Sequence, residues 1–200
     1  MLWDESAISI HYHYFSGYIL PGKANTITAW CDGSFAPHAR GAGAYIIAGS
    51  NQELEDVELQ TQSTLTFDNP TSSYETELVT LKATTSYYLD RQHLNRRNIH
   101  IFTDSLSYLA QLNSLATKPK LVHVIIDELS DHLANLRANS NNIDFHFIPS
   151  HVGISSNDDV DKLANDAREN GADEHLEHRP LLSSYKLHIR KAHKEISPLK

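Results

Sequence analysis

The stretch from Thr26 to Ser50, TITAWCDGSFAPHARGAGAYIIAGS, holds two short β-rich runs with turn-forming residues between them. TITAWC and AGAYIIAG carry β-branched and aromatic residues, and the segment that separates them contains Gly, Pro and Asp. This alternation is typical of strands joined by a loop. VELQTQSTL, which begins at Val57, continues the pattern. The sequence therefore predicts a three-stranded meander that starts near Thr26.

The apolar period becomes helical after DNPTSS, which begins at Asp68. Five apolar residues then recur at helical spacing: Tyr74, Leu78, Leu81, Tyr88 and Leu89. The segments that follow are predicted as a strand at 98–102, a short helix at 105–115, a longer helix after Lys118-Pro119-Lys120, a strand at 143–148 and a helix from Asn157. Because strands joined by a crossover helix are normally parallel, this order predicts a mixed sheet. The expected fold is α/β, a five-stranded mixed sheet flanked by helices in the order β-β-β-α-β-α-α-β-α.

The chain divides into three parts by composition. Residues 1–25 show no convincing period and end in the turn signal PGKAN, so they are predicted to be a leader or flank. Residues 26–170 hold all the predicted strands and helices and form the predicted main domain. Residues 171–200 are polar and rich in histidine, and they are predicted to be a C-terminal tail.

Charge and cysteine content narrow the classes of function. The 200 residues carry a formal net charge of -8, which disfavours strong non-specific binding to nucleic acid, because such binding depends on Lys and Arg. Cys31 is the single cysteine, so the chain can build no disulfide of its own and no thiolate zinc site. No apolar run approaches the roughly 20 residues of a membrane helix, and Asp4 and Glu5 argue against a secretory signal. We expect an intracellular, soluble protein.

Two acidic residues stand at the ends of predicted strands. Asp32 follows TITAWC, and Asp104 comes soon after NIHIF. Ligands of open α/β sheets gather at the carboxyl ends of strands, so these two carboxylates are expected to meet there. The alternative is that each is a helix-cap or turn aspartate, a common role before Ser or Gly.

Glu77 differs from its neighbour Glu75. Ser72 and Glu75 fit a capping box, which gives Glu75 a structural role at the helix start. Glu77 shares the predicted apolar stripe with Tyr74 and Leu81, where a carboxylate is costly unless a cation compensates its desolvation. A bound metal ion would do so. The alternative is a buried ion pair with one of three arginines: Arg91, Arg96 or Arg97.

The last helix carries a further acid, and a loop before it carries a histidine. Asp158 and Asp159 lie in the first helical turn, where acids interact favourably with the helix dipole. Asp161 lies one turn further in, so capping does not explain it. His151, in the loop IPSHVG, is a residue type suited to proton transfer at neutral pH.

Oxygen ligands without cysteine favour Mg²⁺, or Mn²⁺ in its place, over zinc. Two such ions about 4 Å apart can activate water and stabilise the leaving oxygen when a phosphodiester is hydrolysed. The four carboxylates Asp32, Glu77, Asp104 and Asp161 therefore point to a two-metal nuclease site.

The motifs WCDGSF, TELVTLKA, FTDS and FIPSHVGISSNDDVDKLA resemble, in their order and spacing, those of the type 1 ribonuclease H family in its retroelement-like form. The resemblance covers about residues 26–170 and implies cleavage of the RNA strand of RNA/DNA hybrids, leaving 3′-hydroxyl and 5′-phosphate ends. It implies that the same four carboxylates bind metal and that His151 assists proton transfer or product release. It also implies substrate contacts at Gly33, Ser34, Ser105 and Asn157.

The chain departs from the family pattern in several places. Ser73 and Tyr74 stand where cellular members often place asparagines that contact the hybrid. Ser156-Asn157-Asp158 replaces the usual Gly-Asn-Glu, and only Lys118 and Lys120 stand where a basic protrusion would follow the short helix. With the acidic balance, these departures favour a domain that works tethered to a reverse transcriptase, or one descended from such an element.

Two alternatives remain from the sequence. One is a catalytically silent module of the same fold used for interaction, and the other is a different nuclease or a transposase of that fold. A separate metal site is a weaker hypothesis, based on the His-x-His and His-x-x-His spacings of His11, His13, His175 and His178.

Overall fold

The computed structural model describes residues 8–12, 25–37, 39–51, 57–68, 70, 72–91, 96–117 and 124–177. Its strands are β1 (Ile8–Tyr12), β2 (Thr26–Ser34), β3 (Gly41–Asn51), β4 (Val57–Phe67), β5 (Asn98–Thr103), β6 (Asn142–Phe147) and β7 (Glu174–Leu176). Its helices are α1 (Ser73–Leu89), α2 (Leu106–Thr117), α3 (Val124–Ala138) and α4 (Ser155–Asn170). The predicted order of elements is confirmed from β2 to α4.

The strands form one mixed sheet in the order β1-β6-β5-β2-β3-β4-β7. β2, β3 and β4 are the antiparallel meander, whereas β5 and β6 join it in parallel. The predicted count of five strands is wrong, because β1 pairs in parallel with β6 and β7 pairs in parallel with β4. Strands of five and three residues are too short to show a clear period in sequence. Parts of the predicted flank and tail thus extend the sheet, while the domain boundaries themselves stay a prediction.

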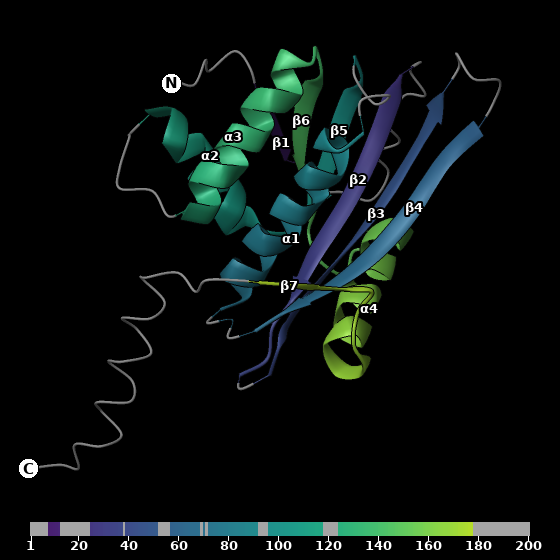
Figure 1. Cartoon of the computed structure of the whole chain (residues 1–200), viewed down its shortest axis with the longest axis vertical. Helices are drawn as coiled ribbons and strands as arrows, with labels where there is room; N and C mark the ends of the chain where they lie inside the picture. Colours follow the sequence, from purple (N-terminus) through teal and green to yellow (C-terminus); the bar gives the residue numbers. More distant parts are fainter. Residues whose placement is uncertain are drawn as a thin grey trace, which may run out of the picture.

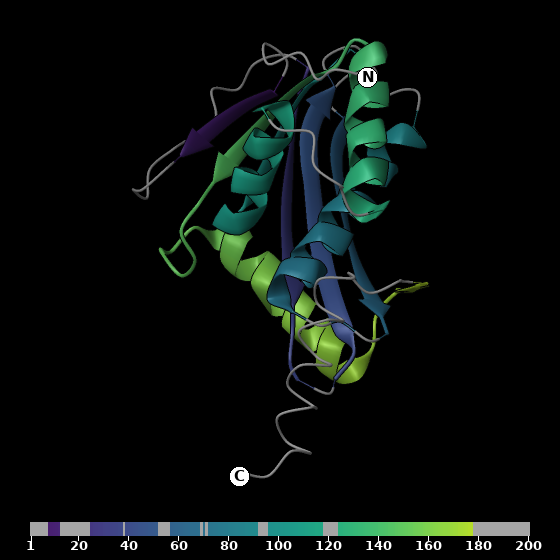
Figure 2. The same ribbon diagram turned by 90° about the vertical axis from the view of Figure 1, so that its left-hand side faces the viewer.

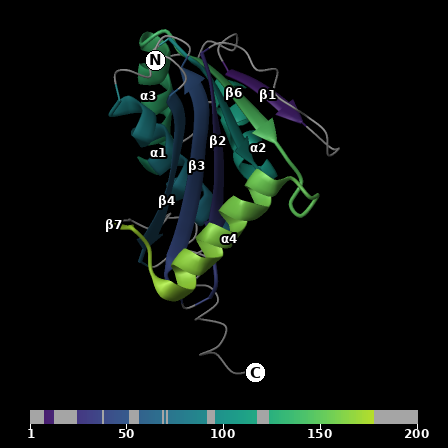
Figure 3. The ribbon, with the colours of Figure 1, turned by 90° about the vertical axis from the view of Figure 1, so that its right-hand side faces the viewer.

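Helices cover both faces of the sheet, as Figures 1 and 2 show: α1, α2 and α3 lie on one face, and α4 crosses the other (Figure 3). Side chains alternate between the faces along a strand. In β2, Ile27, Ala29 and Cys31 join the large core beneath α1 and α3, whereas Trp30 packs on the small cluster under α4. The same alternation assigns Asp32 to the α4 face. In α3, Ile125, Ile126, Leu129, Leu133 and Leu136 are buried and belong to the same large core.

Two facing glycines let α1 approach the sheet closely. Gly33 of β2 pairs with Gly43 of β3. A Cβ atom on Gly43 would lie 1.8 Å from Thr80 Oγ1, and one on Gly33 would lie 2.6 Å from the backbone N of Glu77. Thr80 is fully buried, and its hydroxyl donates to the Thr76 carbonyl at 2.8 Å, which satisfies it within the helix. The glycines therefore set how near α1 lies to β2.

We predict that Gly43→Ala lowers the free energy of unfolding by about 1–3 kcal/mol, because the new methyl group overlaps Thr80 in a packed layer. Gly49→Ala is the matched control in the same strand, since its Cβ would come no nearer than 3.1 Å to any neighbour. Urea unfolding followed by circular dichroism measures both. A Gly43→Ala variant no less stable than Gly49→Ala would contradict this packing.

Candidate active site

Three of the predicted carboxylates converge at one end of the sheet. Each of Asp32, Glu77 and Asp104 offers an oxygen atom, and these atoms all lie within 4.8 Å of one another. Asp32 and Asp104 follow Trp30 and Phe102 by two residues, and those two rings are paired in the parallel β2–β5 ladder and stacked at 4.2 Å. The strand register therefore brings both aspartates together at the carboxyl ends of β2 and β5, as the sequence predicted.

Asp32 is held in a shielded, negatively charged environment. Its residue is only 8% exposed, and Oδ1 accepts a hydrogen bond from the backbone N–H of Gly33 at 2.7 Å. Burial raises the pKa of Asp32 to about 7, and the charge of Asp104 adds to the shift. Near neutral pH this carboxyl group is therefore poised between its protonated and ionised forms, a property frequent at functional sites.

Glu77 reaches the same cluster from the first turns of α1. Burial raises the pKa of Glu77 well above its ordinary value, and the charges of Asp32 and Asp104 raise it further. Two of the arginines considered as ion-pair partners contact other groups: the Arg91 guanidinium lies 3.5 Å from the Tyr87 ring centre, and Arg97 donates to Asn25 Oδ1 at 2.7 Å. A cation bound between the carboxylates would relieve this repulsion.

Asp104 is tied to the loop that carries His151. The Ser150 hydroxyl donates to Asp104 Oδ2 at 2.6 Å. His151 follows directly, exposed and with a positive φ of 57°, in the left-handed region that is uncommon for residues other than glycine. The structure thus places the predicted proton-transfer residue one position from a side chain bonded to the cluster. Ser150 was not predicted, although it lies within the quoted IPSHVG motif.

Asp161 adjoins the cluster without belonging to the group of three. Its charge and a hydrogen bond raise the pKa of Asp32, so the two carboxyl groups are neighbours. Asn165, one turn further along α4, donates from Nδ2 to Asp161 Oδ1 at 2.8 Å, and its own Oδ1 accepts from the Ser34 hydroxyl at 2.7 Å. Asn165 was also not predicted, because nothing in the sequence links it to Ser34, 131 positions away.

Of the predicted substrate contacts, Gly33 and Ser105 directly follow Asp32 and Asp104 in the chain, and Ser34 is bonded to Asn165. Ser34, Ser105 and Asn157 are buried, and Gly33 lies against the backbone of α1. The Ser105 N–H donates to Thr103 Oγ1 at 3.1 Å, and the Asn157 N–H donates to the Ile154 carbonyl at 3.0 Å. Their roles toward a substrate stay predictions, while their packing gives each a structural role as well.

Glu75, Asp158 and Asp159 are the acids that the sequence explained by helix capping or by the helix dipole. The Glu75 N–H donates to the Ser72 hydroxyl at 3.3 Å, which confirms Ser72 as the N-cap of α1, although the side chain of Glu75 is also fully buried. Asp158 and Asp159 are exposed in the first turns of α4.

The histidines singled out in the sequence lie apart from one another. His11, on edge strand β1, has Nε2 3.5 Å from Asp144 Oδ1, and His175, on edge strand β7, has Nε2 3.6 Å from Asp68 Oδ2. β1 and β7 are the opposite edges of the sheet. His13 and His178 lie outside the described residues, so the paired chelation remains a prediction.

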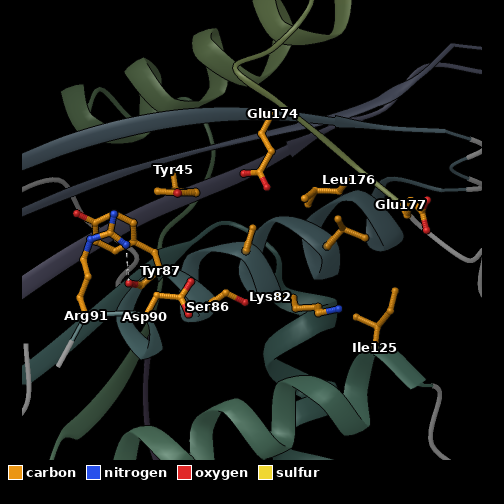
Figure 4. A pocket seen from close by; sticks show the side chains of 12 residues that line it. Tyr45, Lys82, Ser86, Tyr87, Asp90, Arg91, Ile125, Glu174, Leu176 and Glu177 are labelled. Atoms are coloured by element: carbon orange, nitrogen blue, oxygen red, sulfur yellow. Dashed lines mark hydrogen bonds between the residues drawn. The ribbon is translucent and has the colours of Figure 1, made fainter.

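A pocket of about 440 Å³ lies away from the carboxylates, between α1, α3, β3 and β7 (Figure 4). Tyr45, Tyr87 and Leu176 form part of its wall, and Glu174 points into it from β7 (Figure 4). None of the four predicted metal-binding acids lines it.

Comparison with protein families finds a match to RNase H over residues 24–169. Comparison with curated proteins finds no match.

Solved structures share the fold at low sequence identity. LC9-RNase H1, described as a type 1 RNase H with the type 2 active-site motif, is 12% identical with a TM-score of 0.54, over 78% of this chain and 77% of that one. The N-terminal RNase H domain of a Mycobacterium tuberculosis protein is 17% identical, with a TM-score of 0.53 over 74% of this chain and 96% of that chain. LC11-RNase H1, solved in complex with an RNA/DNA hybrid, is 16% identical, with a TM-score of 0.51 over 72% and 96%.

Within the part of the chain that the structure describes, no helix has the length and apolar character needed to cross a membrane.

The raised pKa of Asp32 predicts how the stability of the metal-free protein depends on pH. Between about pH 4 and pH 7 the folded protein keeps a proton that the unfolded chain has released, so the free energy of unfolding falls as pH rises through this window. Glu77 acts in the same direction, because its pKa is raised too. A bound divalent cation favours the ionised forms, so we expect Mg²⁺ to raise the melting temperature more at about pH 8 than at about pH 5.

Thermal denaturation with Mg²⁺ and with EDTA at the two pH values measures this effect. Asp32→Asn is the matched variant, because it keeps the shape of the side chain and removes the titrating group. It should flatten the dependence on pH and reduce the response to Mg²⁺. An equal Mg²⁺ effect at both pH values in the unmodified chain would count against the cation site.

Proposed function

Because the chain belongs to the ribonuclease H family, we propose that it is an endonuclease that hydrolyses the RNA strand of RNA/DNA hybrids. The observation that carries the proposal is the group formed by Asp32, Glu77 and Asp104, whose oxygen atoms lie within 4.8 Å of one another. Burial raises the pKa of both Asp32 and Glu77, and the charges of the neighbouring acids raise it further. Such an arrangement costs stability unless it serves to bind positive charge.

The donor set fits a hard divalent cation. Asp32, Glu77 and Asp104 supply only carboxylate oxygens, the ligands that Mg²⁺ and Mn²⁺ prefer. Cys31 is the one cysteine, and it is buried in the core beneath α1. We propose Mg²⁺ as the natural ion, with Mn²⁺ as a substitute, and two ions in the working site, with Asp161 completing the ligand set. Bound there, the ions would polarise the phosphodiester and lower the pKa of an attacking water.

The residues around the cluster have distinct roles in this proposal. Gly33 and the β2–β5 register fix Asp32 and Asp104 at the carboxyl ends of these strands, and the close approach of α1 brings Glu77 to them. Ser150 fixes Asp104 and the start of the His151 loop. His151, exposed at the edge of the site, would exchange a proton with solvent or with the departing product. The products would carry 3′-hydroxyl and 5′-phosphate ends.

The chain is proposed to depend on another module for affinity. Its net charge of -8 disfavours tight binding to a polyanion by this chain alone. We therefore propose that it acts inside the cell while tethered to a reverse transcriptase, or that it derives from a retroelement of that kind.

A gel assay with labelled substrates tests the function. The full chain should cut the RNA strand of an RNA/DNA hybrid in Mg²⁺ or Mn²⁺, and EDTA should stop the reaction. Matched duplex DNA and duplex RNA should remain intact. Cutting of duplex DNA would favour another nuclease or a transposase of this fold, and failure with every metal would favour a silent interaction module.

Asp104→Asn should lower the rate of hybrid cleavage by at least about 100-fold, because loss of a metal-binding carboxylate removes several kcal/mol of transition-state stabilisation. The metal-free variant should be at least as stable as the unmodified chain, since one repelling charge is gone. Asp159→Asn is the control: it neutralises an exposed acid of α4 that has only a helix-dipole role. Retained cleavage in Asp104→Asn, or an equal loss in Asp159→Asn, would refute the site.

A further inference from the structure

Asp161 reaches the site from a different layer of the fold than the other acids. Asp32 and Asp104 extend from the sheet, whereas Asp161 lies on α4, which crosses the face of β2 and β3 (Figure 3). α4 packs there through a small cluster of Ala44, Val160 and Ala164. Trp30, Ile46 and Leu163 pack against this cluster. Apolar contacts hold the helix on the sheet but are not directional, so hydrogen bonds are what fix the position of a carboxylate on the helix.

A chain of two hydrogen bonds supplies such a restraint. The Ser34 hydroxyl, at the end of β2, donates to Asn165 Oδ1 at 2.7 Å, and Asn165 Nδ2 donates to Asp161 Oδ1 at 2.8 Å. Both polar atoms of the amide are thus used: Oδ1 accepts from the hydroxyl, and Nδ2 donates to the carboxyl oxygen. Ser34 is buried, which favours persistence of the link.

The exposed end of the same helix provides a comparison. Asn170 Nδ2 donates to Asp166 Oδ1 at 2.6 Å, with the same spacing of four residues. Both Asn170 and Asp166 are exposed. The pair Asn165–Asp161 differs in two ways: its asparagine is bonded to the sheet through Ser34, and its aspartate neighbours Asp32. Spacing along the helix therefore does not account for the Ser34 contact.

We propose that Asn165 is a positioning residue that holds Asp161 against the end of β2, so that this carboxylate contributes to cation binding beside Asp32. The inference rests on the proposed function, since it concerns the same site. It assigns Ser34 to the support of Asp161 in addition to any contact with substrate. Arg168, one turn beyond Asn165, adds a second tie between α4 and the segment after β2, by donating to the Phe35 carbonyl at 3.4 Å.

Binding of Mn²⁺ to the full chain, measured without substrate by the electron paramagnetic resonance of free Mn²⁺, tests the proposal. Asn165→Ala should weaken Mn²⁺ binding by about 10-fold, as is typical when a partner of a metal ligand is removed. Ser34→Ala removes a single hydroxyl and should weaken binding in the same direction by a smaller factor. Asn170→Ala, the control on the same helix, should leave Mn²⁺ binding unchanged.

A double-mutant cycle separates positioning from general stability. When Asp161 is already replaced by Ala, adding Asn165→Ala should weaken Mn²⁺ binding by a further factor of less than about 2, because the carboxylate that Asn165 holds is absent. Full additivity of the two substitutions would overturn the proposal. So would an Asn165→Ala variant that binds Mn²⁺ as Asn170→Ala does, or an Asp161→Ala variant with unchanged affinity. Since substrate is absent, a chain that passes these tests and cuts no hybrid would refute the proposed function and leave the positioning role intact.

Discussion

The close approach of α1 to the sheet is the constraint on which the site depends. Gly33 and Gly43 face each other on β2 and β3, and the space that their missing side chains leave is filled by the backbone and threonines of α1. Thr76 and Thr80 tolerate burial there because their hydroxyls donate to carbonyls of their own helix. The same contact places the backbone of Glu77 directly over Gly33, one residue from Asp32. The contact that packs α1 on the sheet therefore also positions Glu77 beside Asp32.

The negative charges of the clustered carboxylates repel one another. Asp32, Glu77 and Asp104 are gathered at one end of the sheet. Burial raises the pKa of Asp32 and Glu77, and the charges of the neighbouring acids raise it further. The fold tolerates the cost of burying these charges close together because the large core fixes the register of β2 and β5 and the position of α1 on the sheet. A cation bound among these carboxylates would offset both their repulsion and the cost of burying their charge. A hydrogen bond from Ser150 holds Asp104, and one from Asn165 holds the neighbouring Asp161.

Much of this arrangement could be predicted from the sequence, and the reasons are physical. Alternation in TITAWC, the helical period after Ser72 and the position of each acid relative to its element led to the order of elements and to Asp32, Glu77 and Asp104. β1 and β7 were missed because five and three residues leave no clear period. Asn165 and Ser150 were missed because hydrogen bonds over 131 and 46 positions leave no pattern in the sequence. The packing of the α1 threonines was missed for a similar reason, because they contact Gly33 and Gly43, which lie on strands distant in the sequence.

Asp32, Glu77 and Asp104 are proposed to bind a divalent cation together. Anomalous diffraction from crystals of the full chain soaked in Mn²⁺ tests it most directly, because the signal locates the ion with no assumption about activity. We expect a peak in contact with carboxylate oxygens of all three residues. Crystals that show Mn²⁺ only at other acidic groups, with these three carboxylates free of it, would contradict the claim.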